Sequence, residues 1–420
     1  MALSFTNDLN TAIDNFFPVK TIRFHPTDKP WITGHIKQLI KERQRAFHTG
    51  DAHLWRQYRR MVQLEIKIKK NNFYTKKIQN LKKGDVRQWW HIIDTMSGRQ
   101  KNQLQFTIER DGHLLSEADL VESLNEFFVS VASDIPPLDI LNLPTFLPSA
   151  FPPPTVHPHE VCSKLVKLQT NKAMGPDNIP PRILKEFANE LAEPVTLIFN
   201  KSLSSGLVPA LWKDSSIIPI PKAKQVHLES ETRPIALTSV LSKVFEDFVV
   251  TWIIEDVGKQ IDNRQFGSLK GTSTTYCLLD LVHNWLSKMD NPGHYLRACF
   301  LDFSKAFDRI DHNVVITKLI NLGVRRSIIP WICSFLSNRR QCVNLGRSMS
   351  RWLPNNAGVP QGTKLGPILF AIMINDLKIA SPRSSNWKYV DDVTISEIVP
   401  TREVSILQNE LDAISDWTNT

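Results

Sequence analysis

The feature that most constrains this chain is a pair of adjacent carboxylates, Asp391 and Asp392, which follow Tyr389-Val390 and precede the β-prone run 393–395. Strand-forming residues on both sides of a short polar pair predict a β-hairpin with the carboxylates at its tip. An Asp-Asp pair at a turn most often only caps its own backbone, since aspartate tolerates unusual backbone angles. A catalytic role therefore requires a third carboxylate from elsewhere in the chain.

Asp302 is the candidate partner, because it ends the apolar run 298–301 as a strand end would. Three carboxylates from two strand ends suit a pair of Mg²⁺ ions, which take oxygen ligands and keep coordination places for substrate phosphates. Two such ions about 4 Å apart stabilise both the attacking and the leaving oxygen of an in-line phosphoryl displacement. The three aspartates thus predict phosphoryl transfer, provided that the strands converge.

The order of three motifs resembles that of reverse transcriptases: Asp302 with Phe307-Asp308, then Gly358-Val359-Pro360-Gln361-Gly362, then Tyr389-Val390-Asp391-Asp392. Residues 358–377 most resemble non-LTR (LINE-like) retrotransposons, and similar blocks run from about residue 171 to 417. The resemblance implies an α+β right-hand polymerase. Its antiparallel palm sheet would be backed by helices, with inserted helical fingers and a separate basic helical region before them.

The implied activity is that of an RNA-directed DNA polymerase acting in retrotransposition, with an RNA template, a DNA primer and dNTPs as partners. A primer 3′-hydroxyl, activated by one Mg²⁺ held at Asp302 and Asp391, would attack the α-phosphate of a dNTP, while a second ion neutralises pyrophosphate. Mn²⁺ is the alternative metal. The resemblance also implies that Phe303 offers its backbone carbonyl to a metal, and that Asp392 is either a ligand or a neighbour that tunes the other two.

Four residues are implied to bind the incoming nucleotide. Lys222 and Arg233 come from the β-like runs 215–224 and 233–238; a point charge and a planar fork suit a triphosphate, and the alternative is a pair of solvated surface cations. Phe307 occupies the place of the bulky residue that blocks a ribose 2′-hydroxyl, which implies selection of deoxynucleotides. Gln361 resembles the residue that contacts the sugar of the nucleotide.

The template and primer contacts implied by the resemblance involve Lys172, Gly175, Gly362 and Tyr389. Glycines in the 358–362 loop would let the backbone approach the nascent base pair closely. The block Gln265-Phe266-Gly267 is also similar to the family, but Ser268-Leu269 departs from its more usual aromatic-basic pair. No contact is assigned to that block.

The positive charge of the chain is concentrated in residues 36–101, with 17 Lys and Arg against 5 Asp and Glu. This local excess is larger than the +9 of the whole chain, so the remainder is net negative. Interleaved aromatics and the apolar spacing predict two or three amphipathic helices. Either the segment grips RNA or DNA through phosphate contacts and base stacking, or it is a solvated helical bundle with an aromatic core.

Three regions follow from composition. Residues 1–135 form the basic, mainly helical nucleic-acid-binding region, of which 1–30 are a loosely ordered lead-in. Residues 136–158 are a linker, because their many prolines block helices and sheet ladders. The resemblance implies that residues 159–420 form the reverse transcriptase, with fingers at about 159–294 and palm at about 295–420.

Other protein classes are excluded by what the sequence lacks. No run approaches the roughly 18 apolar residues of a membrane span, and no signal peptide is evident. The five cysteines form no CxxC pair, which excludes a zinc knuckle and a disulfide framework. An intracellular protein of cytoplasm and nucleus is expected, and its oligomeric state is not predicted.

Two rival functions stay open. The chain stops at Thr420, before the thumb of the family, and it has no room for the upstream endonuclease, so we expect a truncated element copy. Such a copy is either an active polymerase or an inert relic that only binds nucleic acid. The second rival, an RNA-dependent RNA polymerase, would need a small or polar residue in place of Phe307.

Overall fold

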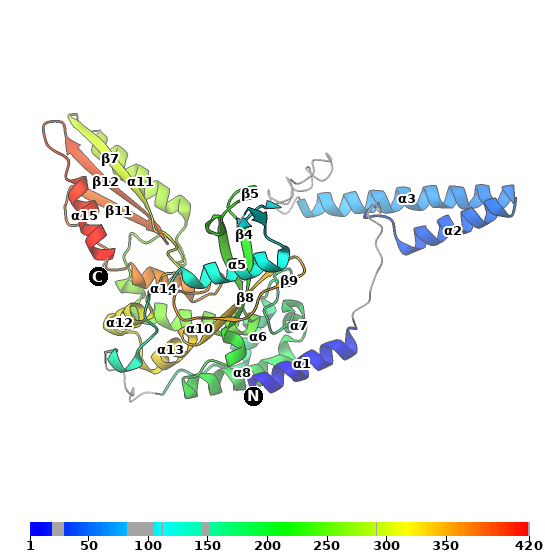
Figure 1. The fold of residues 1–420 in the computed structure, drawn as a ribbon, viewed down its shortest axis with the longest axis horizontal. Coiled ribbons are helices and arrows are strands. Elements are labelled where there is room, and N and C mark those ends of the chain that lie inside the picture. Colours follow the sequence, from blue (N-terminus) through cyan, green and yellow to red (C-terminus); the bar gives the residue numbers. More distant parts are fainter. Residues whose placement is uncertain (19–28, 82–104, 111, 145–151, 291, 419–420) are drawn as a thin grey trace. The chain divides into compact units, whose positions relative to one another are not determined.

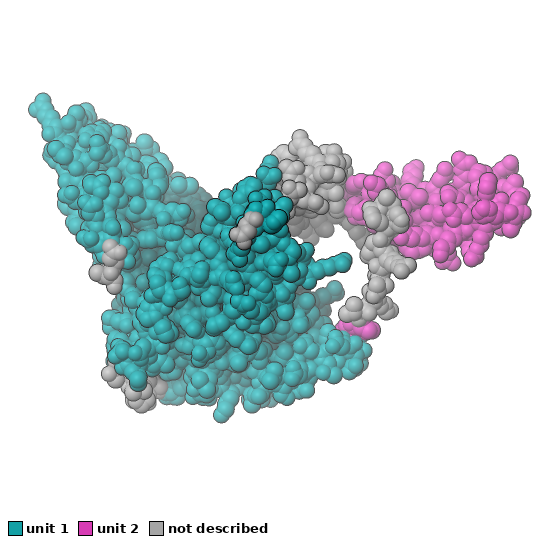
Figure 2. Space-filling view, in the orientation of Figure 1, with its two compact units in different colours: residues 1–16, 104–420 teal, residues 17–103 magenta. Residues whose placement is uncertain are grey.

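The computed structural model describes residues 1–18, 29–81, 105–110, 112–144, 152–290 and 292–418 (Figure 1). The chain divides into two compact units (Figure 2). Residues 1–16 and 104–420 form the larger unit, and residues 17–103 form the smaller one. This division does not follow the boundary predicted near residue 135, because residues 104–130 pack within the larger unit.

The smaller unit contains two helices, α2 (Gly34–His48) and α3 (Ala52–Leu81), as the apolar spacing predicted. Thr33 caps α2, because its side chain accepts a hydrogen bond from the backbone of Ile36. Aromatic side chains pack on one another: the Trp31 ring lies 5.7 Å from Phe73 and 5.6 Å from Tyr74. These aromatics therefore take part in packing the unit, while residues 82–104 lie outside the described part of the chain.

The N-terminal residues belong to the larger unit. Helix α1 (Ala2–Phe16) packs Ala2, Phe5 and Leu9 against its main core, and the Asn10 side-chain amide donates to a backbone oxygen of Asp177 (3.0 Å). The prediction of a loosely ordered lead-in over residues 1–30 is therefore wrong for α1, where the apolar residues share one helix face. Residues 19–28 of that segment are not described.

A three-stranded antiparallel sheet in the larger unit has the order β11 (Ser384–Tyr389), β12 (Asp392–Pro400), β7 (His294–Asp302). Helix α11 (Thr274–Met289) packs Cys277 and Leu281 against Trp387 on one face. Helix α15 (Leu407–Thr418) covers the other face, against Val393 and Ile395 (Figure 1). A helix therefore packs against each face of the sheet, and the predicted hairpin at Asp391-Asp392 is confirmed.

The second sheet of this unit has the order β10-β8-β4-β6, with β9 paired to β8. Its strands are β4 (Asp214–Pro221), β6 (Thr232–Leu237), β8 (Arg339–Leu345), β9 (Ser348–Met349) and β10 (Leu353–Asn355). Helix α5 (Glu117–Ser130) covers it, with Leu124 and Phe128 against strand residues Ile217, Ala236 and Val343. Two short strand pairs complete the β-structure of this unit: β1 (Gln105–Phe106) pairs with β5 (Gln225–Val226), and β2 (Glu109–Arg110) with β3 (His113–Leu114).

The main core lies among helices. They are α6 (Pro158–Val166), α7 (Pro181–Glu186), α8 (Ala188–Ser205), α9 (Ala210–Lys213), α10 (Val240–Val257), α12 (His312–Leu322), α13 (Ile329–Leu336) and α14 (Gly366–Met373). Short 3₁₀ turns occur at Ile140–Asn142, Glu229–Glu231, Gly258–Gln260 and Arg326–Ile328. The rings of Phe199, Trp212, Phe245 and Trp331 pack together at its centre.

The architecture is a mixture of helices and sheets, in agreement with the predicted α+β class. All five cysteines are free thiols, as their spacing predicted. Within the described residues, no helix is both long and apolar enough to cross a membrane.

Candidate active site

The three predicted carboxylates converge at one end of the three-stranded sheet. Asp392, the first residue of β12, is directly opposite Asp302, the last residue of β7. Tyr389 on β11 is opposite Asp392 on its other side, so Val390 and Asp391 form a two-residue hairpin turn. Strand register thus brings Asp302 next to two carboxylates that follow it in the sequence by 89 and 90 positions.

The charges in this cluster interact. Burial raises the pKa of Asp391 above its usual value, and the neighbouring charges of Asp392 and Asp302 raise it further. Arg233 opposes this, since its positive charge lowers the pKa of Asp391. A cation bound at the tip of the hairpin would relieve the repulsion that the three carboxylates exert on one another.

The donor set fits a hard divalent cation. Oxygen is the only ligand atom that the three side chains offer, and carboxylate oxygens are preferred by Mg²⁺ and Mn²⁺. Across the described ranges, no group of three or more His, Cys, Asp or Glu side chains has the arrangement of a metal site. Asp302, Asp391 and Asp392 offer the donor atoms for one at the end of the sheet.

The turn itself is strained. Val390 has φ 60°, in the left-handed region that a β-branched residue rarely adopts. Two-residue hairpin turns require positive φ because their twist must match that of the strands. Such a conformation costs about 1–3 kcal/mol and persists only where the surroundings hold it.

The predicted triphosphate ligands come from the second sheet. Arg233 is exposed on β6, opposite Ile220 of β4, and its charge reaches Asp391. Lys222 follows β4 and donates from Nζ to the backbone oxygen of Ser230 (3.1 Å). Its charge reaches Lys305 and Asp308 in the turn after β7. Of the two predicted triphosphate ligands, Arg233 thus acts on the carboxylate cluster, whereas Lys222 acts on Lys305 and Asp308.

Lys305 is a cation that sequence reasoning did not single out. Burial lowers its pKa, and the charge of Lys222 lowers it further, whereas Asp308 raises it. Its ammonium lies 5.0 Å from the centre of the Phe127 ring, and its backbone has φ 54°. The sequence shows Lys305 only as an unremarkable lysine, because nothing local indicates the positive φ or the approach of α5.

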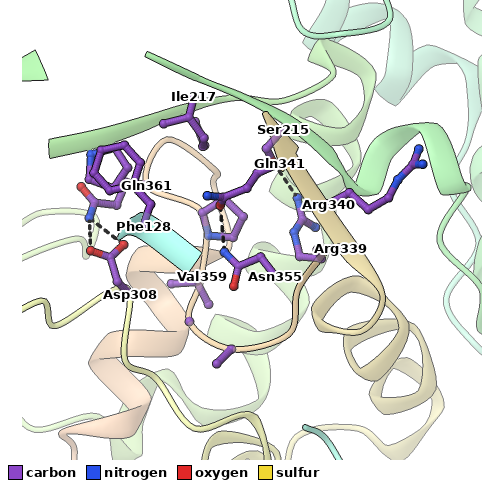
Figure 3. Close-up of a pocket in the computed structure, with 15 residues that line it drawn as sticks. Phe128, Ser215, Ile217, Asp308, Arg339, Arg340, Gln341, Asn355, Val359 and Gln361 are labelled. Carbon is purple, nitrogen blue, oxygen red and sulfur yellow. Dashed lines mark hydrogen bonds between the residues drawn. The ribbon is translucent and has the colours of Figure 1, made fainter. Parts of the chain in front are cut away.

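Gln361 is held by Asp308, a contact that sequence reasoning also missed (Figure 3). The Gln361 Nε2 donates to both carboxylate oxygens of Asp308, at 3.0 and 3.1 Å. Burial raises the pKa of Asp308, and the hydrogen bond from Gln361 and the charges of Lys305 and Lys222 lower it. Because Nε2 faces Asp308, the oxygen of the Gln361 amide is the atom left for other partners.

Phe307 stacks on Phe370 of α14, with ring centres 5.2 Å apart. Its backbone oxygen accepts a hydrogen bond from the N–H of Val359 (2.8 Å). The Phe303 side chain packs against the hydrophobic cores while its carbonyl lies next to Asp302 in the chain. The turn after β7 and the 358–362 loop are thus joined by backbone contacts.

The glycines predicted to face nucleic acid approach the chain's own backbone. A Cβ at Gly358 (φ 67°) would lie 2.4 Å from the backbone oxygen of Asp308, and one at Gly362 (φ 124°) 2.7 Å from that of Ala236. At Gly175 it would lie 2.5 Å from Thr238. The positive φ angles of Gly358 and Gly362 are not helical, and α14 begins only at Gly366.

The other predicted template contacts are located as follows. Lys172 is exposed in the loop after α6. Tyr389 is half-buried and packs against the cluster of Trp387, Cys277 and Leu281. Neither residue has its side chain enclosed in the core, so both remain predictions as nucleic-acid contacts.

Comparisons with known proteins agree with this site. Residues 220–420 match the family described as "Reverse transcriptase (RNA-dependent DNA polymerase)". The chain is 31% identical over 274 residues to the RNA-directed DNA polymerase from mobile element jockey of Drosophila melanogaster, covering 61% of this chain and 29% of that protein. It is 30% identical over 298 residues to the probable RNA-directed DNA polymerase from transposon BS of the same species, covering 67% and 32%.

A third relative, the probable RNA-directed DNA polymerase from transposon X-element of Drosophila melanogaster, is 31% identical over 223 residues, 52% of this chain and 24% of that protein. The matches thus span about a third or less of these relatives' length. The matched region contains all three carboxylates and the cations beside them. Residues 220–420 are therefore similar to the reverse transcriptase family, and the relatives named above are RNA-directed DNA polymerases, established or probable, from mobile elements and transposons.

Proposed function

We propose that this chain is an RNA-directed DNA polymerase that adds dNTPs to a primer 3′-hydroxyl during retrotransposition. The observation that carries the proposal is the meeting of Asp302, Asp391 and Asp392 at one sheet end, with the charge of Arg233 reaching them. Carboxylates for metal ions beside cations for phosphates are the two parts that nucleotidyl transfer requires.

The division into palm and fingers follows from this site. The three-stranded sheet with α11 and α15 is the palm, since it carries the carboxylates. Strands β4 and β6 and the helices around α8 and α10 belong to the fingers, at about residues 159–294, since β6 carries Arg233 and Lys222 directly follows β4.

Asp302 and Asp391, together with the Phe303 carbonyl and Asp392, would hold two Mg²⁺ ions. Bound there, the ions would supply activation of the primer hydroxyl and charge neutralisation at the leaving pyrophosphate. Arg233 binds two phosphate oxygens through its planar fork, and Lys222 and Lys305 add point charges. These residues orient the triphosphate and compensate its charge.

Phe307 and Gln361 select nucleotides by their sugar. The Phe307 ring, fixed by its stack on Phe370, excludes a ribose 2′-hydroxyl by its bulk. Gln361, whose Nε2 is held by Asp308, presents its amide oxygen to a hydroxyl of the sugar. Lys172, Gly175, Gly362 and Tyr389 line the path of template and primer.

The smaller unit binds the phosphate backbone of the nucleic acid. Its aromatics pack with one another, and Arg59 and Lys70 lie over the rings of Trp55 and Trp31, at 5.1 and 5.8 Å from the ring centres. The positive charge of the segment, rather than base stacking, is then the main source of affinity, and binding weakens steeply with salt.

Primer extension tests the polymerase. The purified chain is given a DNA primer on an RNA template with Mg²⁺ and dNTPs, beside Asp391→Asn and, as a matched control, Asp416→Asn on the exposed side of α15. We expect extension by the wild type and the control, and none by Asp391→Asn. Ribonucleotides offered in parallel should not be used.

Two outcomes would overturn the proposal. Extension with ribonucleotides as efficient as with dNTPs would indicate an RNA polymerase. Salt-dependent binding of the hybrid without any extension would leave the second candidate, a relic that only binds nucleic acid. The positive segment 36–101 favours that candidate, because its charge supports binding whether or not the carboxylates act.

A further inference from the structure

Val390 is the residue whose backbone decides where Asp391 points. It lies between the last residue of β11 and Asp391, in a left-handed conformation with φ 60°. Rotation of its peptide units would move the Asp391 carboxylate away from Asp302 and Asp392. The strained turn therefore needs a support outside the hairpin.

That support is Gln265. The segment before α11 runs beside β11: the Lys388 N–H donates to the Arg264 oxygen (2.9 Å), and the Phe266 N–H donates to the Lys388 oxygen (2.8 Å). Between them the Gln265 side chain, only 2% exposed, reaches the turn. Its Oε1 accepts hydrogen bonds from the N–H groups of Val390 (3.0 Å) and Gly267 (2.9 Å).

The two N–H donors fix the orientation of the Gln265 amide. Both require an acceptor, and only the oxygen of a glutamine amide can accept. Its Nε2 is buried and has no hydrogen-bond partner among the described residues. Gln265 thus leaves one of its own polar groups unsatisfied while it satisfies the turn.

Gly267 closes the support from the other side. A Cβ on Gly267 would lie 2.5 Å from both the backbone nitrogen and the Cγ2 of Val390. The backbone at Gly267 therefore limits the space available to Val390, and no residue with a side chain fits there without a shift.

Lys388 anchors the same segment to β11. Its ammonium is fully buried and donates to the Asp262 carboxylate (2.8 Å) and to the backbone oxygens of Ile374 (3.0 Å) and Leu377 (2.6 Å). Both ends of the stretch 262–267 are thus tied to the hairpin, by Lys388 at one end and by Gln265 with Gly267 at the other. Gln265 is thereby held in a fixed position relative to the turn.

We propose that Gln265 is a positioning residue for the carboxylate cluster: by holding Val390 in its left-handed conformation, it keeps Asp391 beside Asp302 and Asp392 and so sets the metal affinity of the site. This inference rests on the proposed polymerase function and deepens it. Gln265 touches neither metal nor substrate, and its effect passes through the backbone of Val390.

The test compares Mn²⁺ binding, measured by electron paramagnetic resonance on the full chain, in Gln265→Leu, Val390→Gly and the double variant. Leucine has a similar volume but no acceptor, so we expect about 10-fold weaker Mn²⁺ binding, or about 1.4 kcal/mol. Glycine adopts positive φ without steric cost. Val390→Gly should therefore restore most of the affinity to the Gln265→Leu chain.

The matched control is Gln341→Leu. Gln341 is another buried glutamine; it lies on β8, and its side chain is hydrogen-bonded to Asn125 and Asn355. Its replacement should lower stability without moving the three carboxylates. If Gln265→Leu does not fold, Gln265→Asn replaces it, because asparagine is one methylene too short to reach both N–H groups. Mn²⁺ affinity equal to the wild type, or no rescue by Val390→Gly, would overturn the proposal.

The outcome is separable from that of the polymerase. A wild type that binds Mn²⁺, loses it in Asp391→Asn and yet makes no DNA would refute the polymerase while the comparison at Gln265 still stands. If the wild type binds no Mn²⁺, hydrogen exchange over residues 389–392 decides. We expect faster exchange in Gln265→Leu than in Gln341→Leu, and equal rates would refute the support.

Discussion

Glu246 offers a sharp test of how the 358–362 loop is held. This carboxylate on α10 is fully buried. It accepts hydrogen bonds from the N–H groups of Lys364 (2.7 Å) and Leu365 (3.3 Å), at the entry to α14, and from the hydroxyl of Ser242 (2.9 Å). The start of a helix favours a negative charge, because its free N–H groups carry partial positive charge.

Substitution by alanine should be costly. Glu246→Ala leaves two buried N–H groups without an acceptor, and each such group costs about 1–3 kcal/mol. We therefore expect Glu246→Ala to lower the free energy of unfolding by about 2–6 kcal/mol. With a urea slope of about 3 kcal/mol per M, the unfolding midpoint falls by about 1 M or more.

Glu246→Gln is the matched variant. Its amide oxygen can accept from both N–H groups, and its amide nitrogen can donate to Ser242, so every hydrogen bond is kept. Only the charge is lost, and we expect a cost of about 1 kcal/mol. Urea unfolding followed by tryptophan fluorescence suits the measurement, because Trp212 and Trp331 are buried in the same core.

An equal loss in the two Glu246 variants would refute this reasoning. It would mean that the negative charge of Glu246 itself stabilises the fold, through its interaction with Arg339. Arg339 is buried and has a pKa lowered to about 10 by burial, which the charge of Glu246 partly offsets. Its hydrogen bonds go to the Phe335 backbone and to Ser215, not to a carboxylate.

Three further outcomes are expected. Gly358→Ala should lower the free energy of unfolding by about 2 kcal/mol or more, since the added Cβ would lie 2.4 Å from a backbone oxygen. The control is Gly323→Ala: this position has φ 91° and nothing within 4 Å of the added Cβ, so only the strain of an alanine at positive φ should lower stability. Equal urea midpoints for the two variants would contradict the prediction. Burial lowers the pKa of His312 in the folded chain from 6.5. The unfolded chain therefore binds a proton there more readily, and the free energy of unfolding falls as the pH drops below about 6.5. His312→Gln should make the free energy of unfolding less dependent on pH between 7.5 and 5.5. Arg233→Lys keeps the charge but loses the fork, and should raise the KM for dNTPs about 10-fold in primer extension; an unchanged KM would remove Arg233 from the triphosphate site.

Local sequence patterns were sufficient for some elements of the fold. Strand-forming residues around Asp391-Asp392 predicted the hairpin, and apolar spacing in residues 36–101 predicted the helices α2 and α3. Both patterns record which face of an element is buried, and that information is local. Helix α1 at residues 2–16 was missed because its apolar residues are scattered among polar ones along the sequence and share one face only once the helix has formed.

The candidate site could be predicted only in part. The residue types and order of Asp302, Asp391, Asp392 and Arg233 indicated metal and phosphate chemistry, because these groups are the ones that such chemistry requires. Their meeting depended on strand register, which pairs Asp302 with Asp392. Register is set by packing across the whole sheet, so no single segment contains it.

The supports of the site were beyond local reasoning. Gln265 reaches Val390 over 125 positions, and Gln361 reaches Asp308 over 53. The residue type of an aspartate already indicates a possible metal ligand. The residue type of a glutamine does not indicate a supporting role, which becomes visible only when its hydrogen-bond partner is known. The residue types of this chain therefore determine which chemistry the candidate site can support. The geometry that orients those residues is determined only when distant segments pack together.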